Sequence, residues 1–181
     1  MSDDKIESSF LMLKPDALER DLFNEVLSYF RDSDLRIPAM TREQVDEETV
    51  EEHYSHVPDE ILEGLHDYFD GEEVVIAVVY GENAIERTRE IAGSDWKPEQ
   101  NPYGTIRGDI HNPNSPLYWE NGIAEEDQDL WERRYHSEKT LEGEPTYTLV
   151  HTADPEEDLP QEVAKKEAAR FFGEEITNYM A

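Results

Sequence analysis

A histidine stands at the end of a short apolar segment, where a strand would deliver it to one edge of a sheet. His151 closes the run "TYTLVH" (146–151), and the acidic, proline-containing stretch "TADPEED" follows it. A histidine at such a position can carry chemistry, because a neutral imidazole is a nucleophile or a base near neutral pH. The alternative is that the strand simply ends there.

Three basic residues also stand where the sequence predicts that elements end or turn. Lys14 belongs to "LKPD", where a proline stops an apolar run and leaves the lysine at its end. Arg89 follows the longest apolar run, and Arg107 lies in "GTIRGD" between two glycines that permit tight turns. A guanidinium grips phosphate oxygens with a fork of donors and an ammonium acts as a point charge, so the three could hold a polyphosphate. The alternative is that each pairs with one of the many carboxylates.

A second group of candidate ligands offers a metal site. His53 and His56 lie close together, with Glu52 beside them and His66 further on. Their spacing falls short of the i, i+4 pair that places two histidines on one helical face for zinc. Imidazoles and carboxylates are also common on surfaces, so the sequence favours no bound metal here.

The hydrophobic pattern predicts alternating strands and helices. A proline at position 38 predicts an edge or a bulge in the second strand. The strands are expected over residues 8–14, 34–44, 72–81 and 146–151. Helices are expected over 16–33, over 46–71 as two short helices broken near Pro58, over 82–93, around 125–138 and over 161–172.

This order predicts an α/β (α+β) protein built as a split βαββαβ sheet with helices on one face. In that arrangement the first and last strands are neighbours. Lys14, which ends the first, and His151, which ends the last, would then share one edge of the sheet. The length of 181 residues suits one domain over 1–181.

The composition is very acidic, and this excludes some partners. The chain carries 45 Asp and Glu against 16 Lys and Arg, a formal net charge of −29. Such a charge repels phosphate backbones, so nucleic acid is not expected as a partner. The acids are spread between apolar segments such as "EEVVIAVVY", which is typical of a folded protein in a salty cytoplasm and not of a disordered tail. We therefore interpret the chain as halophilic.

Other absences narrow the class further. The chain has no cysteine, so disulfides and thiolate metal sites are impossible. No run of about 18 apolar residues exists to span a membrane, and the start "MSDDKIESSF" has no secretory pattern. A soluble, cytoplasmic protein with no membrane partner is expected.

Several short motifs, in order, resemble those of nucleoside diphosphate kinases. They are "FLMLKPDALER", "HY" at 53–54, "GENAIERTREIAG", "GTIRGD" and the late "LVH" followed by a glutamate and "FF". The "KPD" triplet, the "GTIRGD" hexapeptide and the late histidine are specific in combination, although each alone is weak. The resemblance covers roughly residues 8–172. It implies a ferredoxin-like fold with a four-stranded antiparallel sheet, and exchange of a γ-phosphate between nucleotides through a phosphohistidine.

The resemblance also implies a role for individual residues. His151 would be the nucleophile, and Glu167 would orient its ring through the other nitrogen. Tyr54 matches the tyrosine of the "HY" pair. The positions expected to bind the nucleotide are Lys14, Ile61, Leu65, Arg89, Asp95, Arg107 and Thr148, with Ile61 and Leu65 clamping the base.

The partners implied by the resemblance are nucleoside di- and triphosphates. Magnesium (Mg²⁺) would accompany them, held mainly by the nucleotide phosphates and water and not by protein ligands. Members of the family are usually hexamers and sometimes tetramers, so a homo-oligomer is expected.

The chain departs from the family pattern at four places. Thr148 stands for an asparagine, and Ala153 lacks a hydroxyl that supports the acid contacting the histidine. Asp95 stands for a phosphate-loop threonine, unless Ser94 takes that place. An insertion over about 110–146 lengthens the segment before His151. Its Arg133, Arg134 and His136 could reach the site, but a solvated loop helix is expected.

These departures define the alternatives. A slower enzyme is one outcome, since a lost supporting hydrogen bond is worth about 1 kcal/mol. A catalytically weak or inactive nucleotide-binding or assembly module is another, because an unpaired carboxylate at Asp95 would oppose a triphosphate. A phosphocarrier would use the same histidine without a base clamp.

Overall fold

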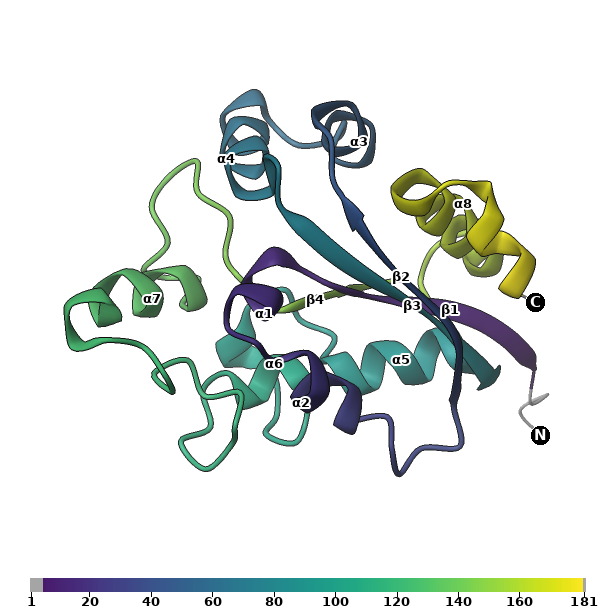
Figure 1. Ribbon diagram of the computed structural model, residues 1–181, viewed down its shortest axis with the longest axis horizontal. Helices are drawn as coiled ribbons and strands as arrows, with labels where there is room; N and C mark the ends of the chain where they lie inside the picture. The colour runs from purple at the N-terminus through teal and green to yellow at the C-terminus, as the bar shows by residue number, and fades with distance from the viewer. Residues whose placement is uncertain (1–4, 181) are drawn as a thin grey trace.

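The protein forms one four-stranded antiparallel sheet with helices packed on it, as the computed structural model describes for residues 5–180 (Figure 1). The strand order is β2-β3-β1-β4, and every neighbouring pair is antiparallel. The strands are β1 (Ile6–Leu13), β2 (Arg36–Gln44), β3 (Glu73–Glu82) and β4 (Val150–Thr152). The α+β class and the ferredoxin-like strand order predicted from the sequence are confirmed.

The predicted adjacency of the first and last strands is also confirmed. Met12 of β1 pairs with His151 of β4, and Leu13 pairs with Val150. The backbone N–H of Lys14 then donates to the carbonyl of Leu149 at 2.8 Å. The lysine therefore lies beside the start of β4, close to the histidine. The expectation that His151 ends the last strand was wrong, because β4 continues to Thr152, which pairs with Leu11.

Helices cover both faces of the sheet, so the expectation of helices on one face was wrong. Leu11 and Leu13 face a core cluster with α1, α2, α5, α6 and α7, whereas Phe10 and Met12 face a second cluster with α3, α4 and α8. Figure 1 shows these two layers below and above the sheet. The reason lies in the strands: β1 ends in the apolar run 10–13 and β3 contains the apolar run 74–79, and strands with such runs are buried on both faces.

The helices begin and end close to the predicted places. Pro58 separates α3 from α4, as expected, and a bulge interrupts β2 between Arg36 and Ala39, next to Pro38. The α-helices are α1 (Pro15–Glu19), α2 (Phe23–Ser28), α3 (Glu47–His53), α4 (Asp59–Phe69), α5 (Ala84–Ala92), α6 (Ile106–Asp109), α7 (Gln128–Tyr135) and α8 (Pro160–Phe172). Short 3₁₀ helices are η1 (Pro98–Gln100), η2 (Glu125–Asp127) and η3 (Glu174–Tyr179).

Two elements are shorter than predicted because single residues take a left-handed backbone. Asp21, with φ of 55°, divides the expected helix 16–33 into α1 and α2. Leu149, with φ of 65°, lies at the centre of a three-residue turn in which the N–H of Val150 donates to the carbonyl of Thr148 at 2.7 Å. The last strand therefore starts at Val150 and not at 146.

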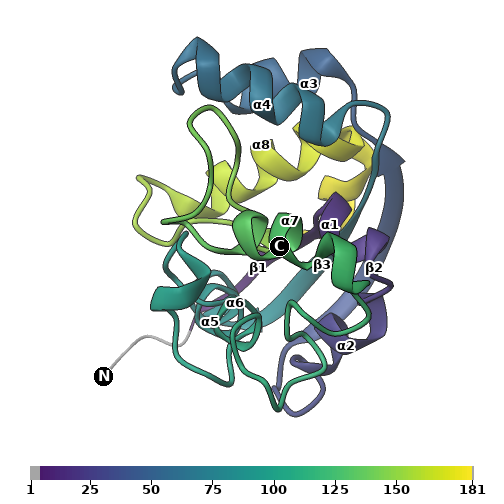
Figure 2. The ribbon, with the colours of Figure 1, turned by 90° about the vertical axis from the view of Figure 1, so that its left-hand side faces the viewer.

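The insertion packs into the core, and the expectation of a solvated loop helix was wrong. Ile110, Leu117 and Tyr135 are fully buried, and Trp131 is nearly so. Figure 2 shows α7 facing the viewer. Its aromatic side chains join the cluster that also holds α1 and α5, so the insertion adds to the same hydrophobic core.

Among the described residues, no helix is long and apolar enough to cross a membrane.

Candidate active site

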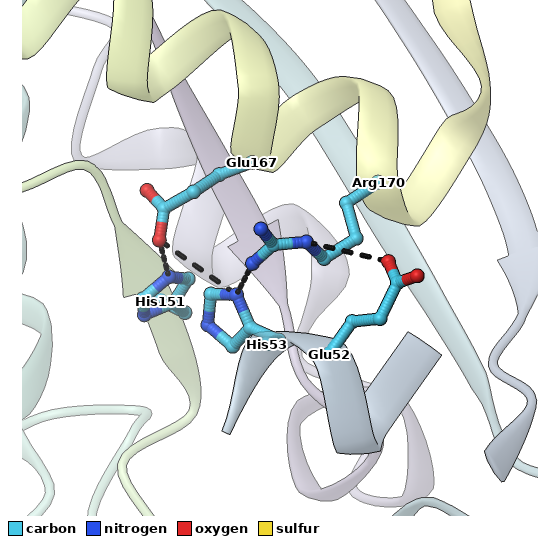
Figure 3. Close-up of polar contacts among 5 residues, drawn as sticks. All are labelled: Glu52, His53, His151, Glu167 and Arg170. Carbon is cyan, nitrogen blue, oxygen red and sulfur yellow. Dashed lines mark hydrogen bonds and ion pairs between the residues drawn. The ribbon is translucent and has the colours of Figure 1, made fainter. Parts of the chain in front are cut away.

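His151 sits where β1 and β4 meet, with one ring nitrogen against a carboxylate. Its Nε2 atom lies 3.6 Å from Oε1 of Glu167 on α8, and the side chain is 25% exposed (Figure 3). Phe10 packs against the ring at a centroid distance of 5.5 Å. The carboxylate thus favours a proton on Nε2, which leaves Nδ1 with a free lone pair.

A second histidine shares the same carboxylate. His53, at the end of α3, lies with Nδ1 3.7 Å from Oε1 of Glu167, and its ring meets that of His151 edge to face at 5.0 Å. Arg170 of α8 approaches the same Nδ1 atom with NH1 at 3.3 Å (Figure 3). A guanidinium only donates, so Nδ1 of His53 accepts and carries no proton.

This assignment decides which of the two histidines carries a proton on the nitrogen nearest Glu167. Without a proton on Nδ1, His53 has nothing to donate to the carboxylate, so the charge of Glu167 acts on Nε2 of His151, which lies 3.6 Å away and makes no hydrogen bond among the described residues. Burial, together with the charges of His151 and Arg170, lowers the pKa of His53 to about 2. His53 is therefore a neutral ring that packs against His151, and this contact was missed by the sequence analysis.

Lys14 and Arg107 bring two buried cations to this edge of the sheet. Nζ of Lys14 donates to the hydroxyl of Thr148 at 3.3 Å and lies 5.2 Å from the ring centre of Tyr68. The Arg107 guanidinium donates to the carbonyls of Gly93 and Val150 at 3.0 and 3.1 Å. Burial lowers the pKa of Lys14 to about 8 and that of Arg107 to about 10, so both groups are charged at neutral pH.

An open cavity of about 740 Å³ connects these groups. Its size suits a small-molecule ligand. The lining includes seven of the residues proposed from the sequence: Lys14, Tyr54, Ile61, Leu65, Arg107, Thr148 and His151. Burial raises the pKa of Tyr54, which keeps its hydroxyl protonated.

Three of the proposed residues do not line the cavity. Glu167 lies behind His151, as its role as an orienting group requires. Arg89 donates to the carbonyl of Ser94 at 3.0 Å, and its charge helps to lower the pKa of Arg107 nearby. Asp95 accepts from the N–H of Lys97 at 2.9 Å, so its carboxylate caps its own loop and the neighbouring Trp96 lines the cavity instead.

The insertion supplies one wall of the cavity, although not through the residues that the sequence had offered. Ser137, Thr140, Leu141, Glu144 and Thr146 all line it, whereas Arg133, Arg134 and His136 do not. The loop also comes close to α4: a Cβ atom on Gly64 would lie 1.9 Å from the carbonyl oxygen of Gly143. In the sequence, only the length of the insertion before His151 indicates that it could reach α4.

The carboxylate of Asp16, in the "KPD" triplet, connects several of the elements around the site. It is fully buried and accepts hydrogen bonds from the hydroxyls of Tyr68 and Tyr135 and from the N–H of Leu149, the last two at 3.0 Å. One carboxylate thus joins α1, α4, the insertion and the turn before β4. The motif had drawn attention to Lys14, and the structural role of the aspartate was missed.

The metal site considered around His53, His56, Glu52 and His66 does not form within the described residues. His53 belongs to the cluster with His151 and Glu167, and His66 lies near Glu47 and Glu51. His56 lines the cavity and belongs to none of the candidate metal clusters in the described part of the chain.

Comparison with known proteins supports the resemblance to nucleoside diphosphate kinases. The family model described as "Nucleoside diphosphate kinase" matches residues 7–115. The nucleoside diphosphate kinase of Pyrococcus furiosus is 30% identical over 176 residues, which cover 97% of this chain and 89% of that protein. That of Methanobrevibacter smithii is 37% identical over 58% of this chain and 70% of its own length.

A solved structure agrees on the fold. The structure of a halophilic nucleoside diphosphate kinase from Halobacterium salinarum in complex with CDP superposes with a TM-score of 0.66. The two chains are 22% identical, and the match covers 98% of this chain and 91% of the other.

Proposed function

The chain belongs to the nucleoside diphosphate kinase family of phosphotransferases, and we propose that His151 carries the phosphate between its two nucleotide substrates. The observation that carries this proposal is the contact between Nε2 of His151 and Glu167 at 3.6 Å, beside a cavity that both Lys14 and Arg107 line. One nitrogen is held by an acid and the other is left for phosphorus, as a nucleophilic histidine requires.

The transfer occurs in two half-reactions. Nδ1 of His151 attacks the γ-phosphorus, an N–P bond forms, the bond from phosphorus to the β–γ bridging oxygen breaks, and a nucleoside diphosphate leaves. A terminal oxygen of a second nucleoside diphosphate then attacks the same phosphorus, the N–P bond breaks, and neutral His151 is restored. Glu167 lies beside Nε2, and its negative charge stabilises the positive charge that the ring gains.

The buried cations stabilise the transferred group. Lys14 and Arg107 line the cavity, where low polarity strengthens their attraction for phosphate oxygens. Arg89 adds positive charge from behind Arg107. Asp95 offsets part of this charge, since its carboxylate acts on Arg107 and raises the pKa of that group, while it also accepts from the N–H of Lys97 in its own loop.

The base is held by apolar side chains from two elements. Val57, Ile61 and Leu65 approach the cavity from the α3–α4 region, and Leu141 approaches from the insertion. Packing against the faces of a base is tolerant of its identity. We therefore expect little discrimination among bases.

Magnesium is the expected metal partner, and the donors of the cavity fit the way in which it would bind. Glu144 supplies the one carboxylate in the described lining, and it pairs with Arg133 at 3.3 Å. The protein thus offers no cage of oxygen ligands, which supports binding through nucleotide phosphates and water. When bound, the ion would neutralise phosphate charge.

We further propose a cytoplasmic enzyme that works as a homo-oligomer, either a hexamer or a tetramer. The cytoplasmic location and the homo-oligomeric state are both inferred from membership of the family. Sedimentation equilibrium at high salt distinguishes six subunits from four, and a monomeric mass would contradict the assembly.

Phosphate transfer to the protein itself tests the mechanism. Wild-type protein incubated with γ-labelled ATP and Mg²⁺ at high salt should acquire an acid-labile, base-stable label that moves to added GDP. His151→Ala should acquire none. His56→Gln removes another histidine of the same cavity and should keep the label. A folded protein that binds ATP and takes no label would indicate the inactive binding module instead.

A further inference from the structure

Two histidines and a glutamate come together outside the active site, where the insertion meets the loop after α5. Glu99 of η1, His111 and His136 each offer one ligand atom, and these atoms lie within 4.8 Å of one another. All three residues are half-buried, so an ion could reach them from solvent. The rings of His111 and His136 meet edge to face at a centroid distance of 4.5 Å.

The hydrogen bonds of the first histidine leave a nitrogen free. Nε2 of His111 lies 2.8 Å from the carbonyl oxygen of Tyr135. A carbonyl only accepts, so Nε2 carries the proton and Nδ1 has an unshared lone pair. A histidine that ligates a metal characteristically donates its other N–H to a backbone carbonyl or a carboxylate, which fixes the ring.

The second histidine holds an unsatisfied atom in the same place. Nδ1 of His136 is buried and has no hydrogen-bond partner. Buried polar atoms are rarely left so, because water that would solvate them has been removed without replacement. An aromatic contact with His111 accounts for the packing of the ring and leaves this nitrogen unexplained. A cation would satisfy it.

The carboxylate is fixed by its own neighbours. Ser137 donates its N–H to Oε1 and Oε2 of Glu99 at 3.2 and 3.4 Å, and its hydroxyl also donates to Oε1. Most of the donation goes to Oε1, so Oε2 keeps capacity for a ligand bond. The acid is thereby held against the chain that carries His136.

We propose that Glu99, His111 and His136 bind a zinc-class divalent cation. Two imidazoles and a carboxylate suit zinc, which takes four tetrahedral ligands and fills a vacant position with water. Ligand atoms around zinc lie roughly 3.3 Å apart, given bonds of about 2.0–2.1 Å. Small side-chain rotations would close the remaining gap.

The site would fasten the insertion to the body of the protein. Glu99 precedes Arg107 on the loop that follows α5, whereas His136 is followed by Ser137, which lines the nucleotide cavity. A bound ion would thus fix one wall of that cavity. The proposal concerns metal binding and does not depend on the phosphotransfer mechanism.

Zinc titration of the full chain tests the proposal. Calorimetry should show that His136→Gln loses one zinc equivalent that wild type binds, or binds it at least about tenfold more weakly, as expected for loss of a ligand. His56→Gln, a histidine outside every such cluster, should lose none. The clusters at His151 and His66 remain in both variants, so a difference between them reports this site alone.

A second variant and a second readout guard against misfolding. Glu99→Gln keeps an acceptor for Ser137 and should lose the same zinc equivalent. In wild type, zinc should also slow amide hydrogen exchange over residues 136–146, and in His136→Gln it should not. Equal zinc stoichiometry and affinity in folded His136→Gln, Glu99→Gln and His56→Gln would overturn the proposal.

Discussion

Lys14 holds its charge in the cavity only over part of the pH range. Burial lowers the pKa of its ammonium group to about 8, so the group is charged below that pH and neutral above it. Arg107 alongside it also contributes to the lowering. Phosphate binding depends on the charged form. We therefore predict that the Kd for a non-hydrolysable ATP analogue is flat up to about pH 8 and then rises up to tenfold per pH unit.

Lys14→Arg provides the matched control for this prediction, because a guanidinium stays protonated throughout. Calorimetric titration between pH 7 and 9, below the pKa of about 10 of Arg107, should give a rising Kd for the wild type and a flat one for the variant. The same slope in both proteins would mean that another group titrates. Tyr54 is not that group, since burial raises its pKa above the ordinary value.

His53 makes a second pH-dependent contribution, this time to stability. Its folded-state pKa of about 2 lies below the ordinary value near 6.5. Between these values the unfolded chain binds a proton that the folded chain does not, so the free energy of unfolding falls as the pH drops below about 6.5. One such group contributes a slope of at most about 1.4 kcal/mol per pH unit.

We predict that His53→Gln makes this acid limb shallower by up to that amount. Urea unfolding measured from pH 5 to 6.5 compares the slopes, and His56→Gln controls for removal of an exposed imidazole. An unchanged slope in His53→Gln would show that His53 can take up a proton in the folded state. The assignment of Nδ1 as an acceptor from Arg170 would then be wrong.

Seven of the ten residues proposed from the sequence line the cavity, but their contacts could not be predicted. The motifs point to Lys14, Arg107 and His151 because residue type and order are visible in the chain. The pairing of His53 with Arg170 depends on how α3 packs against α8, which no local pattern records. The direction of the Asp95 carboxylate is likewise set by its loop and not by its residue type.

At the scale of elements, hydrogen bonds to Asp16 connect two helices and the turn before β4. Its carboxylate accepts from Tyr68 on α4, Tyr135 on α7 and the N–H of Leu149. Leu149 is the left-handed residue of the turn that leads into β4. A non-glycine residue persists in this conformation only when its surroundings hold it there. The carboxylate is thus one of the contacts that position His151.

We predict that Asp16→Asn lowers the free energy of unfolding by about 2–3 kcal/mol, because hydrogen bonds to a buried charge are worth about 1.5–3 kcal/mol each. The amide NH₂ would also face a donor. Tyr135→Phe removes one of the three hydrogen bonds with little change of shape and should cost about 1.5 kcal/mol, the lower end of that range. Urea unfolding compares the two, and equal losses would contradict the central role of the carboxylate.

The same turn explains what could not be predicted about the elements. "TYTLVH" alternates as a strand should, and the strand was therefore expected from residue 146. The hydrogen bond from the N–H of Leu149 to the carboxylate of Asp16 spans 133 positions of the chain, and it favours a turn over that local preference. The burial of Trp131 and Tyr135 in the insertion has a similar cause, since both lie in a core cluster that also contains Leu11 and Leu13 of β1.

The charge of −29 acts at the scale of the whole molecule. Folding brings these carboxylates closer together, so their repulsion destabilises the folded state more than the unfolded chain. Salt shortens the range of that repulsion from about 10 Å at 0.1 M to about 3 Å at 1 M. We predict that the Tm rises steeply as KCl is added and then levels off.

Salt also strengthens the burial of apolar groups, so a rise in Tm alone does not establish screening. The triple variant Glu125→Gln/Glu126→Gln/Asp127→Asn separates the two effects. These residues form the exposed helix η2, and none of them lines the cavity. Removing three carboxylates should raise the Tm in 0.1 M KCl, and the difference from wild type should vanish at 2 M. Effects of salt on apolar burial act on both proteins alike and cancel in the difference. A difference in Tm that is zero at low salt, or that persists unchanged at high salt, would mean that repulsion between carboxylates does not limit the stability of this fold.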